Sequence, residues 1–562
     1  MKHFGPISGI ACHPSGFVAT AGYDNQVVLW DASTRKALAR GLHDHLANQC
    51  AFTPDGRHVI SSSSDYSARL WSVPDMRLAA VFDGHTDDIE MTAIHPDGTR
   101  VATCSRDTDI RTFYVDGRPI ACLKGHENDV ISVGWEGDSD ILISSSDDGT
   151  VRRWNAMEGS LLETVDLGGV ETDTIVITET GTIFAGNDNG EVLTIKHGVV
   201  TAEPAHNAGV KRLAYSGQSR QIVSLSYDRK LMIWKVEDGD KLVKIHEAEL
   251  PSMIWPRSVA FQDENVLVFG TFGSTYATYN QTTQIWITDN IEPDISLNAV
   301  VAHEGNTYTI GDAGQVKRDG EIVSETGSLC NFLLPFGSMI LTGGQIGVVY
   351  DAKTGKAIHQ HRSPLNTGAV FMRDGVEHAI IGAYTGEGIV FRVDENGHAQ
   401  YVMDVQLDEN AIKGLACSAE YIFSVCATGA ASHFRISDFS PIPEYADTHD
   451  KIANSCTVLP DGTFASVSRD LTLRLWKDGT VEVHPSPLQN SIKCVAASRD
   501  GYFLAAGSYG GHIAIFDVSK RKWSHVERLT AAGISNLSSG HEPSSFIASS
   551  YDGMIYPIDP EA

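Results

Sequence analysis

The sequence of 562 residues contains no cysteine pair spaced C-x-x-C, no excess of basic residues and only 20 prolines against 52 glycines. Nine scattered cysteines disfavour a secreted domain held by disulfides. Asp and Glu number 71 against 43 Lys and Arg, and the resulting net charge of -28 disfavours binding to nucleic acid or to an anionic membrane. No apolar signal region opens the sequence. These absences predict a cytoplasmic protein.

One segment lacks charge altogether. Thr326 to Tyr350 has no charged residue and is long enough to span a bilayer. It also contains Pro335 and the pair Gly343-Gly344, which favour a turn. We therefore expect two strands joined by a turn in this segment rather than a membrane helix.

Short apolar segments that end in an aromatic residue recur along the chain. In five of them an Asp lies six residues before a final Trp. The pairs are Asp24 and Trp30, Asp65 and Trp71, Asp148 and Trp154, Asp228 and Trp234, and Asp470 and Trp476. Asp107 precedes Phe113 by the same offset, and Asp24, Asp65, Asp107 and Asp148 follow one another at 41 or 42 positions. Such a period, with four short strands in each unit, is typical of the blades of a β-propeller.

Each well-defined unit also has a His near its start and a Ser-x-Asp in its middle. The four sets are His45, Ser63, Asp65 and Trp71; His126, Ser146, Asp148 and Trp154; His206, Ser226, Asp228 and Trp234; and His449, Ser468, Asp470 and Trp476. With the dipeptides Gly84-His85, Gly125-His126 and Trp30-Asp31, the chain resembles the WD-repeat family. The resemblance implies that each set forms a buried hydrogen-bond chain that fixes the conformation of one blade.

The repeat continues in weaker form through the second half, as fourteen units of about 40 residues. A single propeller holds roughly four to eight blades. We therefore expect an all-β fold of two seven-bladed propellers in tandem, residues 1–292 and 293–562, joined by a polar linker near 289–294. This layout is similar to that of the actin-interacting members of the family.

The last unit ends after three expected strands. The N-terminus, by contrast, has spare residues before its own first strand. We therefore expect Met1 to Phe4 to pair with the fourteenth blade and to cover its open edge.

Ser, His and Asp also form the triad of many hydrolases. A triad is needed once, whereas this set recurs at least four times with a Trp attached. His126-Glu127, His303-Glu304 and His541-Glu542 lack the second His of a zinc-protease motif. His359 and His361 share a strand face without further ligands nearby. We expect no catalytic residue, no metal and no cofactor.

The residue just before the repeated Asp is expected to point toward the central opening of its ring. At this position the chain often has Tyr, Phe or Arg, which protein interfaces concentrate. The candidate partner-binding residues are Tyr23, Arg106, Tyr227 and Phe272 in the first ring and Arg469, Tyr509 and Tyr551 in the second.

These features predict a non-enzymatic scaffold that binds one or more proteins through the b–c and d–a loop faces of its two propellers. It is expected to be monomeric by itself or a subunit of a larger complex, with neither nucleic acid nor membrane as a partner. One alternative is a cofactor of actin-filament disassembly. A second is an enzyme or small-molecule binder with a pocket in the divergent second propeller.

Overall fold

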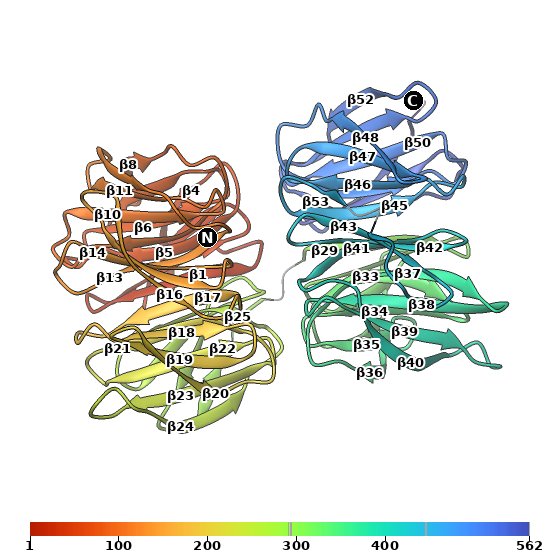
Figure 1. The fold of residues 1–562 in the computed structure, drawn as a ribbon. Coiled ribbons are helices and arrows are strands. Elements are labelled where there is room, and N and C mark those ends of the chain that lie inside the picture. The colour runs from red at the N-terminus through yellow and green to blue at the C-terminus, as the bar shows by residue number, and fades with distance from the viewer. Residues whose placement is uncertain (290, 293–294, 444–446, 561–562) are drawn as a thin grey trace. The chain divides into compact units, whose positions relative to one another are not determined.

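The computed structural model describes residues 1–289, 291–292, 295–443 and 447–560. The chain divides into two units, Met1–Pro293 and Asp294–Ala562, and each contains seven antiparallel sheets (Figure 1). Within the described residues, thirteen sheets have four strands and the last has three, always in sequence order. The prediction of an all-β fold with two seven-bladed propellers is confirmed. We label the strands of each blade a to d, from the centre of the ring outward.

The first unit contains blades 1 to 7. Blade 1 has β1 (Ile7–His13), β2 (Phe17–Gly22), β3 (Gln26–Asp31) and β4 (Ala37–Leu42). Blade 2 has β5 (Ala47–Phe52), β6 (His58–Ser63), β7 (Ala68–Ser72) and β8 (Leu78–Phe82). Blade 3 has β9 (Ile89–Ile94), β10 (Arg100–Ser105), β11 (Ile110–Tyr114) and β12 (Pro119–Leu123). Blade 4 has β13 (Val130–Trp135), β14 (Ile141–Ser146), β15 (Thr150–Asn155) and β16 (Ser160–Asp166). Blade 5 has β17 (Thr172–Ile177), β18 (Ile183–Asn187), β19 (Glu191–Lys196) and β20 (Val199–Pro204). Blade 6 has β21 (Val210–Ser216), β22 (Gln221–Ser226), β23 (Lys230–Val236) and β24 (Leu242–Glu249). Blade 7 has β25 (Ile254–Phe261), β26 (Val266–Thr271), β27 (Ala277–Asn280) and β28 (Ile285–Ile287).

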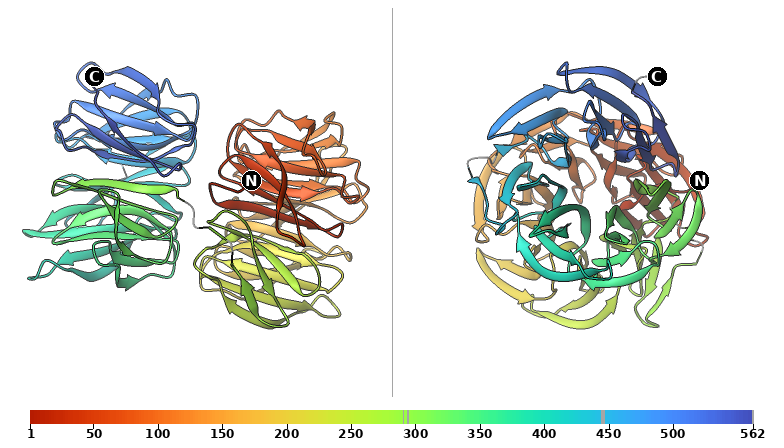
Figure 2. Two further views of the ribbon diagram at one scale, coloured as in Figure 1. Left: turned by 180° about the vertical axis from the view of Figure 1, so that it is seen from behind. Right: turned by 90° about the vertical axis from the view of Figure 1, so that its right-hand side faces the viewer.

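The second unit contains blades 8 to 14, which follow one another around a circle (Figure 2). Blade 8 has β29 (Leu297–His303), β30 (Asn306–Gly311), β31 (Gln315–Arg318) and β32 (Glu321–Glu325). Blade 9 has β33 (Cys330–Phe336), β34 (Met339–Gly344), β35 (Val348–Asp351) and β36 (Lys356–Gln360). Blade 10 has β37 (Leu365–Arg373), β38 (Val376–Ala383), β39 (Glu387–Val393) and β40 (Ala399–Gln406). Blade 11 has β41 (Ile412–Cys417), β42 (Tyr421–Cys426), β43 (Ala430–Arg435) and β44 (Asp447–Thr448). Blade 12 has β45 (Ala453–Val458), β46 (Phe464–Ser468), β47 (Thr472–Lys477) and β48 (Thr480–Pro485). Blade 13 has β49 (Ile492–Ala497), β50 (Phe503–Ser508), β51 (His512–Asp517) and β52 (Lys522–Arg528). Blade 14 has β53 (Ile534–Ser539), β54 (Phe546–Ser550) and β55 (Ile555–Ile558).

Burial falls from the second strand of a blade to the fourth. In β22 five of six residues are buried, whereas all six residues of β20 are exposed. The hydrophobic clusters lie between neighbouring blades: Leu225 of blade 6 packs with Val259 and Phe269 of blade 7. The middle strands are therefore buried on both faces, as in any sheet covered on both sides.

Short turns with fixed chemistry join the strands within a blade. In the turn Pro54-Asp55-Gly56, the Asp55 carboxylate accepts the Thr53 hydroxyl at 2.7 Å and the Arg57 amide at 3.0 Å. Gly56 adopts a φ of 67°, and a Cβ there would lie 2.4 Å from the His13 ring. This position therefore requires glycine.

The first ring closes by contacts between blades 1 and 7 rather than by a shared strand. The His3 amide donates to the Ser274 carbonyl at 2.9 Å, and the Arg35 guanidinium donates to the Tyr276 carbonyl. The prediction that Met1 to Phe4 pair with blade 14 is therefore wrong. His3 instead bonds to Asp24 within blade 1. The three-stranded sheet predicted for blade 14 is present in the part of the chain that the structure describes.

Two other sequence predictions concern the middle of the chain. Of the predicted linker near 289–294, positions 290, 293 and 294 lie outside the described residues. Ile291 is buried in the first unit, and the Glu292 amide donates to the Ser274 hydroxyl at 3.0 Å. The uncharged segment 326–350 contains the antiparallel pair β33 and β34, as predicted. In the described ranges, no helix is long and apolar enough to cross a membrane.

Candidate functional site

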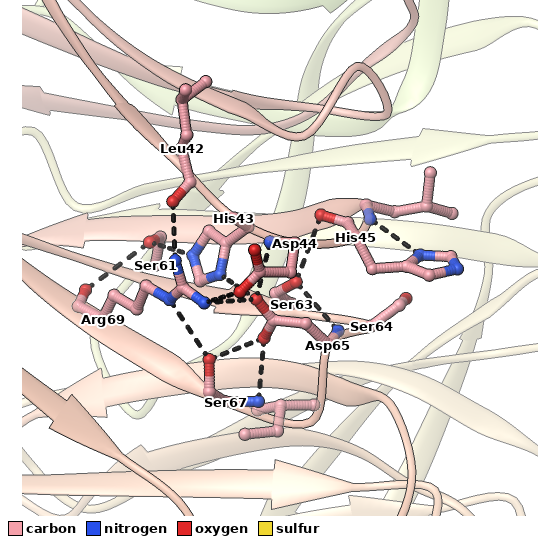
Figure 3. Close-up of polar contacts among 12 residues, drawn as sticks. Leu42, His43, Asp44, His45, Ser61, Ser63, Ser64, Asp65, Ser67 and Arg69 are labelled. Carbon is pink, nitrogen blue, oxygen red and sulfur yellow. Dashed lines mark hydrogen bonds and ion pairs between the residues drawn. The ribbon is translucent and has the colours of Figure 1, made fainter. Parts of the chain in front are cut away.

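The residues that resemble a catalytic triad form a buried strut in each well-defined blade. In blade 2, His43 Nδ1 donates to the Asp65 carboxylate at 2.9 Å (Figure 3). His43 Nε2 shares a hydrogen bond of 2.8 Å with Ser61 Oγ, which also accepts Trp71 Nε1–H at 2.8 Å. The chain of bonds therefore links the loop before the blade, strands β6 and β7 and the turn between these strands.

The same four-residue chain occurs in other blades. Its members are His3, Thr20, Asp24 and Trp30 in blade 1; His126, Ser144, Asp148 and Trp154 in blade 4; His206, Ser224, Asp228 and Trp234 in blade 6; and His449, Ser466, Asp470 and Trp476 in blade 12. In blade 3, His85 bonds to Asp107 and Thr103, and Phe113 replaces the Trp.

Two details of the predicted sets need correction. The His of blade 2 is His43 rather than His45, whose Nδ1 accepts the Leu46 amide. The hydroxyl of each chain also lies two residues before the predicted serine. The predicted serines Ser63, Ser146, Ser226 and Ser468 are therefore not members of the chains. Residues two apart on a strand face the same side, so both serines of a pair are buried, but the earlier one lies within reach of the Trp.

The four later serines have a second structural role. Each accepts the backbone amide of the repeated Asp at 3.0–3.1 Å. Each also donates to a carbonyl in the loop that precedes its blade. The acceptors are His45, Asn128, Ala208 and Lys451, at 2.8–3.3 Å. These bonds attach the b–c turn of the blade to the loop that precedes its innermost strand.

Burial and charge both indicate that these hydrogen-bond chains lie inside the blades and have a structural role. The side chains of His43, His206 and His449 are 0% exposed, so no substrate reaches their imidazoles. Burial alone would raise the pKa of Asp470, but hydrogen bonds from His449 and Thr472 outweigh it and lower the pKa to about 2. A carboxylate held as an anion beside a sequestered His stabilises the fold and is not poised for catalysis.

The first residue of each b–c turn occupies an equivalent place in all fourteen blades. Its amide donates to a carbonyl just before the innermost strand, at 2.9–3.3 Å. We call these positions the rim residues. They are Tyr23, Ser64, Arg106, Asp147, Asp188, Tyr227 and Phe272 in the first unit and Asp312, Gln345, Tyr384, Ala427, Arg469, Tyr509 and Tyr551 in the second. All seven predicted partner-binding residues lie in this set, and that they bind a partner stays a prediction.

A second circle of residues was not predicted. In thirteen blades the innermost strand has a register shift at its second residue, in the manner of a β-bulge. In blade 7 the irregularity is longer and runs from Ile254 to Val259, so it includes the second residue, Trp255. We call these positions the bulge residues. They are Ser8, Asn48, Glu90, Ile131, Asp173, Lys211 and Trp255 in the first unit and Asn298, Asn331, Asn366, Lys413, Asn454, Lys493 and Ser535 in the second. Bulge and rim residues together form what we call the mouth of each unit.

In the mouth of the first unit, cations are paired with carboxylates. The Arg106 guanidinium donates to Glu90 on its own blade and to Asp129, which precedes the next blade. The Lys211 ammonium donates to Asp173 at 2.6 Å and also to Asp188. Each cation therefore joins two neighbouring blades.

Carboxylates nevertheless exceed cations around this mouth. Burial, together with the negative charges of Asp173 and Glu171, raises the pKa of Asp147 well above its usual value. Asp147 Oδ1 is buried and has no hydrogen-bond partner among the described residues. Like charges crowded in this way favour the neutral form of one of them.

Aromatic residues complete the first mouth. Trp255 lies edge-on to Tyr23, with ring centroids 5.0 Å apart, and 5.7 Å from Phe272. Tyr23 is partly exposed, whereas Phe272 is only 5% exposed. Phe272 therefore offers little surface to a partner and packs against the Trp255 ring.

The mouth of the second unit has aromatic and cationic residues. Tyr509 stacks on Tyr551 with ring centroids 6.4 Å apart, and the Arg469 guanidinium lies 5.9 Å from the Tyr509 ring. The Lys413 ammonium lies 4.4 Å from the ring of Tyr384. Tyr384 was missed in the sequence because its blade lacks the Ser-x-Asp signal.

Four bulge asparagines tie the second ring together. Each donates its side-chain amide to the carbonyl of the first residue in the next innermost strand. The pairs are Asn298 and Cys330 (3.1 Å), Asn331 and Leu365 (2.8 Å), Asn366 and Ile412 (2.9 Å), and Asn454 and Ile492 (2.7 Å). Asn48 makes the same bond to Ile89 in the first unit, at 3.0 Å.

The two histidines considered as half a metal site have separate contacts. His359 stacks on Tyr401 with ring centroids 4.4 Å apart, whereas His361 is buried and bonds to Glu387 at 3.1 Å. Across the described positions, no group of three or more His, Cys, Asp or Glu side chains is arranged to hold a metal ion.

Comparison with known families agrees with this geometry. The WD40 family (WD domain, G-beta repeat) matches residues 1–31, 38–72, 76–113, 117–155, 198–235, 441–477 and 479–517. These segments cover blades 1 to 4, 6, 12 and 13, and six of these seven blades contain a His–Asp pair.

Three relatives illustrate the range of similar proteins. A ribosome biogenesis protein WDR12 homolog of Chlamydomonas reinhardtii is 24% identical over 41% of this chain and 63% of its own length. A guanine nucleotide-binding protein subunit beta of Zea mays is 28% identical over 36% and 59%. Actin-interacting protein 1 of Drosophila melanogaster is 27% identical over 27% and 26%. The chain thus spans less than two thirds of the length of these relatives. With WD40 repeats in both units and fourteen blades built on one plan, the chain belongs to the WD-repeat family.

Proposed function

We propose that this chain is a non-enzymatic scaffold that binds protein partners through the mouths of its two propellers. The observation that carries the proposal is the separation of roles within a blade. The His, Ser and Asp side chains are sealed inside the blades, whereas Tyr and Arg gather at the rim positions. Partly exposed Tyr and Arg on a rigid frame are the usual anchors of protein interfaces.

The two mouths offer different chemistry. The first combines Tyr23 and Tyr227 with paired ions, and the second combines Tyr509 and Tyr551 with Arg469. Two different surfaces on one chain would allow two contacts with one partner, or one contact with each of two partners. We further propose a cytoplasmic location, which the nine free thiols support.

The test compares partners recovered by wild type with those recovered by single rim variants. We expect Tyr227→Ala to lose partners of the first unit and Tyr551→Ala to lose partners of the second, with the folding temperature little changed. Matched controls are Tyr114→Ala and Tyr401→Ala, which remove exposed tyrosines from outer strands of the same two units. Quantitative mass spectrometry of affinity-purified samples provides the measurement. Retention of every partner by both rim variants would refute the proposal.

Actin filaments are the second candidate partner. The match to Actin-interacting protein 1 favours them, while relatives of similar identity are named for ribosome biogenesis and for guanine nucleotide binding. Co-sedimentation of the chain with filamentous actin tests this candidate. If the wild-type chain pellets with filaments and Tyr227→Ala or Tyr551→Ala does not, actin is a partner.

A further inference from the structure

The second unit has a small, partly open polar cavity at its mouth. The cavity has a volume of about 120 Å³, and all seven blades contribute to its wall. Every bulge residue of this unit lines it, together with Tyr551 from the rim. The space is large enough for a small ion with several waters and too small for a nucleotide or a drug-sized ligand.

The wall of the cavity is polar and held in place. The four bulge asparagines each donate to the next blade at 2.7–3.1 Å, so their side chains are fixed around the ring. Lys413 and Lys493 lie on the wall two blades apart, with Asn454 on the strand between them. Of the described residues that line the cavity, none is an Asp or a Glu. One side of the wall is therefore cationic.

The charge of Lys493 is the main argument for a ligand in this cavity. Its ammonium lies 5.8 Å from the ring of Tyr509, in a partly buried setting, and has no ion pair with any described carboxylate. In the mouth of the first unit, by contrast, Lys211 contacts two carboxylates. The chain has a net charge of -28, so a lysine beside this cavity that has no ion pair with a described carboxylate is unusual for this protein. Enclosed cations are costly unless an anion or strong hydrogen bonds compensate them.

We propose that this cavity binds a phosphate group, with Lys413 and Lys493 as its direct ligands. An ammonium is a compact donor that pairs well with phosphate oxygens. The Ser535 hydroxyl, which shares a hydrogen bond of 2.9 Å with Ser549, lies on the next blade beyond Lys493. The phosphate reaches the site either as free inorganic phosphate or as the phosphoryl group of a phosphorylated side chain. The proposal is independent of the scaffold function.

Calorimetric titration of the full chain with inorganic phosphate, at low ionic strength in a phosphate-free buffer, tests the site. We expect saturable binding that weakens about tenfold or more in Lys413→Gln and in Lys493→Gln. We expect no detectable binding in the double variant and partial recovery in Lys493→Arg. The matched control is Lys356→Gln, which removes an exposed lysine from β36 of the same unit and should bind as wild type does. Melting temperatures of all variants establish that each is folded.

A second arm uses a phosphoserine peptide and its unphosphorylated form. Binding of the phosphopeptide alone, dependent on both lysines, would support the site and assign its phosphate to a modified side chain. Binding of inorganic phosphate alone would assign it to the free ion. If neither ligand binds wild type, or if the lysine variants bind as tightly as Lys356→Gln does, the proposal is wrong.

Discussion

The two propellers have the same blade plan but are stabilised differently. In the described residues, five blades of the first unit contain a His–Asp pair at 2.7–3.1 Å, whereas in the second unit only blade 12 contains one with the same spacing. Blade 10 instead packs Phe371 and Phe391, and blade 11 packs Phe423 between neighbours. Close apolar packing is thus sufficient for a blade, and the polar strut is an addition to it.

The mouths of the two units also differ in how their charged residues are paired. In the first unit Arg106 and Lys211 are each paired with two carboxylates, yet carboxylates remain in excess, and Asp147 Oδ1 has no hydrogen-bond partner among the described residues. Among the described bulge and rim residues of the second unit, Asp312 is the one carboxylate, and Lys413 and Lys493 line a partly open cavity. A blade that depends on packing leaves its central positions free to acquire another role.

The largest expected difference between the units concerns acid. Hydrogen bonds from the paired His, together with its charge, lower the pKa of Asp65, Asp107, Asp148 and Asp228 in the first unit against the opposing effect of burial. A carboxylate with a lowered pKa stabilises the fold above pH of about 4 and loses this contribution as pH falls toward 2. We therefore expect the first unit to lose several kcal/mol more than the second over this range. Hydrogen exchange measured by mass spectrometry at pH 7, 4 and 2 follows each unit separately, and equal losses would contradict the comparison.

Removal of one strut should have the next largest effect. His126→Asn leaves Asp148 without its imidazole partner in a buried site, which should cost about 3 kcal/mol. The matched control is His197→Asn, because His197 is exposed in a turn with a φ of 52° that Asn tolerates. Thermal or guanidinium unfolding of the first unit measures the change in unfolding free energy for both variants. A loss of less than about 0.5 kcal/mol in His126→Asn would show that packing alone holds this blade as well.

A smaller effect of opposite sign is expected in the first mouth. The pKa of Asp147 is raised by burial and by Asp173 and Glu171, so its ionised form destabilises the fold at neutral pH. Asp147→Asn should therefore stabilise the first unit by about 1 kcal/mol at pH 7. The gain should fade below pH of about 4, where the wild-type carboxyl is neutral in the folded and unfolded states alike. Melting temperatures at pH 7 and 3 give the measurement, and a destabilised variant at pH 7 would contradict the charge balance described for this mouth.

The repeat made the architecture predictable, but the contacts within a blade were not. The offset of six residues between Asp and Trp marked five blades and, with Asp107 and Phe113, set the repeat length of about 41 residues, which extended the count to the other blades. It did not distinguish Ser61 from Ser63, since residues two apart share a face of a strand. It also did not distinguish His43 from His45, which both lie in the loop between β4 and β5. A search for His 21 or 22 residues before each Asp would have found both His43 and His3. The bulge residues had no signal of their own, because a bulge is a property of the pairing between two strands.

The central claim is that struts hold the blades while the mouths bind partners, and a crossed pair of variants in the first unit tests it. Ser144→Ala removes the hydroxyl that joins His126 and Trp154, and Tyr227→Ala removes a ring at the rim. Melting temperature and recovered partners are measured together for both proteins. The account predicts that Ser144→Ala melts several degrees lower yet keeps its partners, and that Tyr227→Ala loses partners while its melting temperature holds. The reverse pattern, or partners lost in Ser144→Ala while it remains folded, would contradict it.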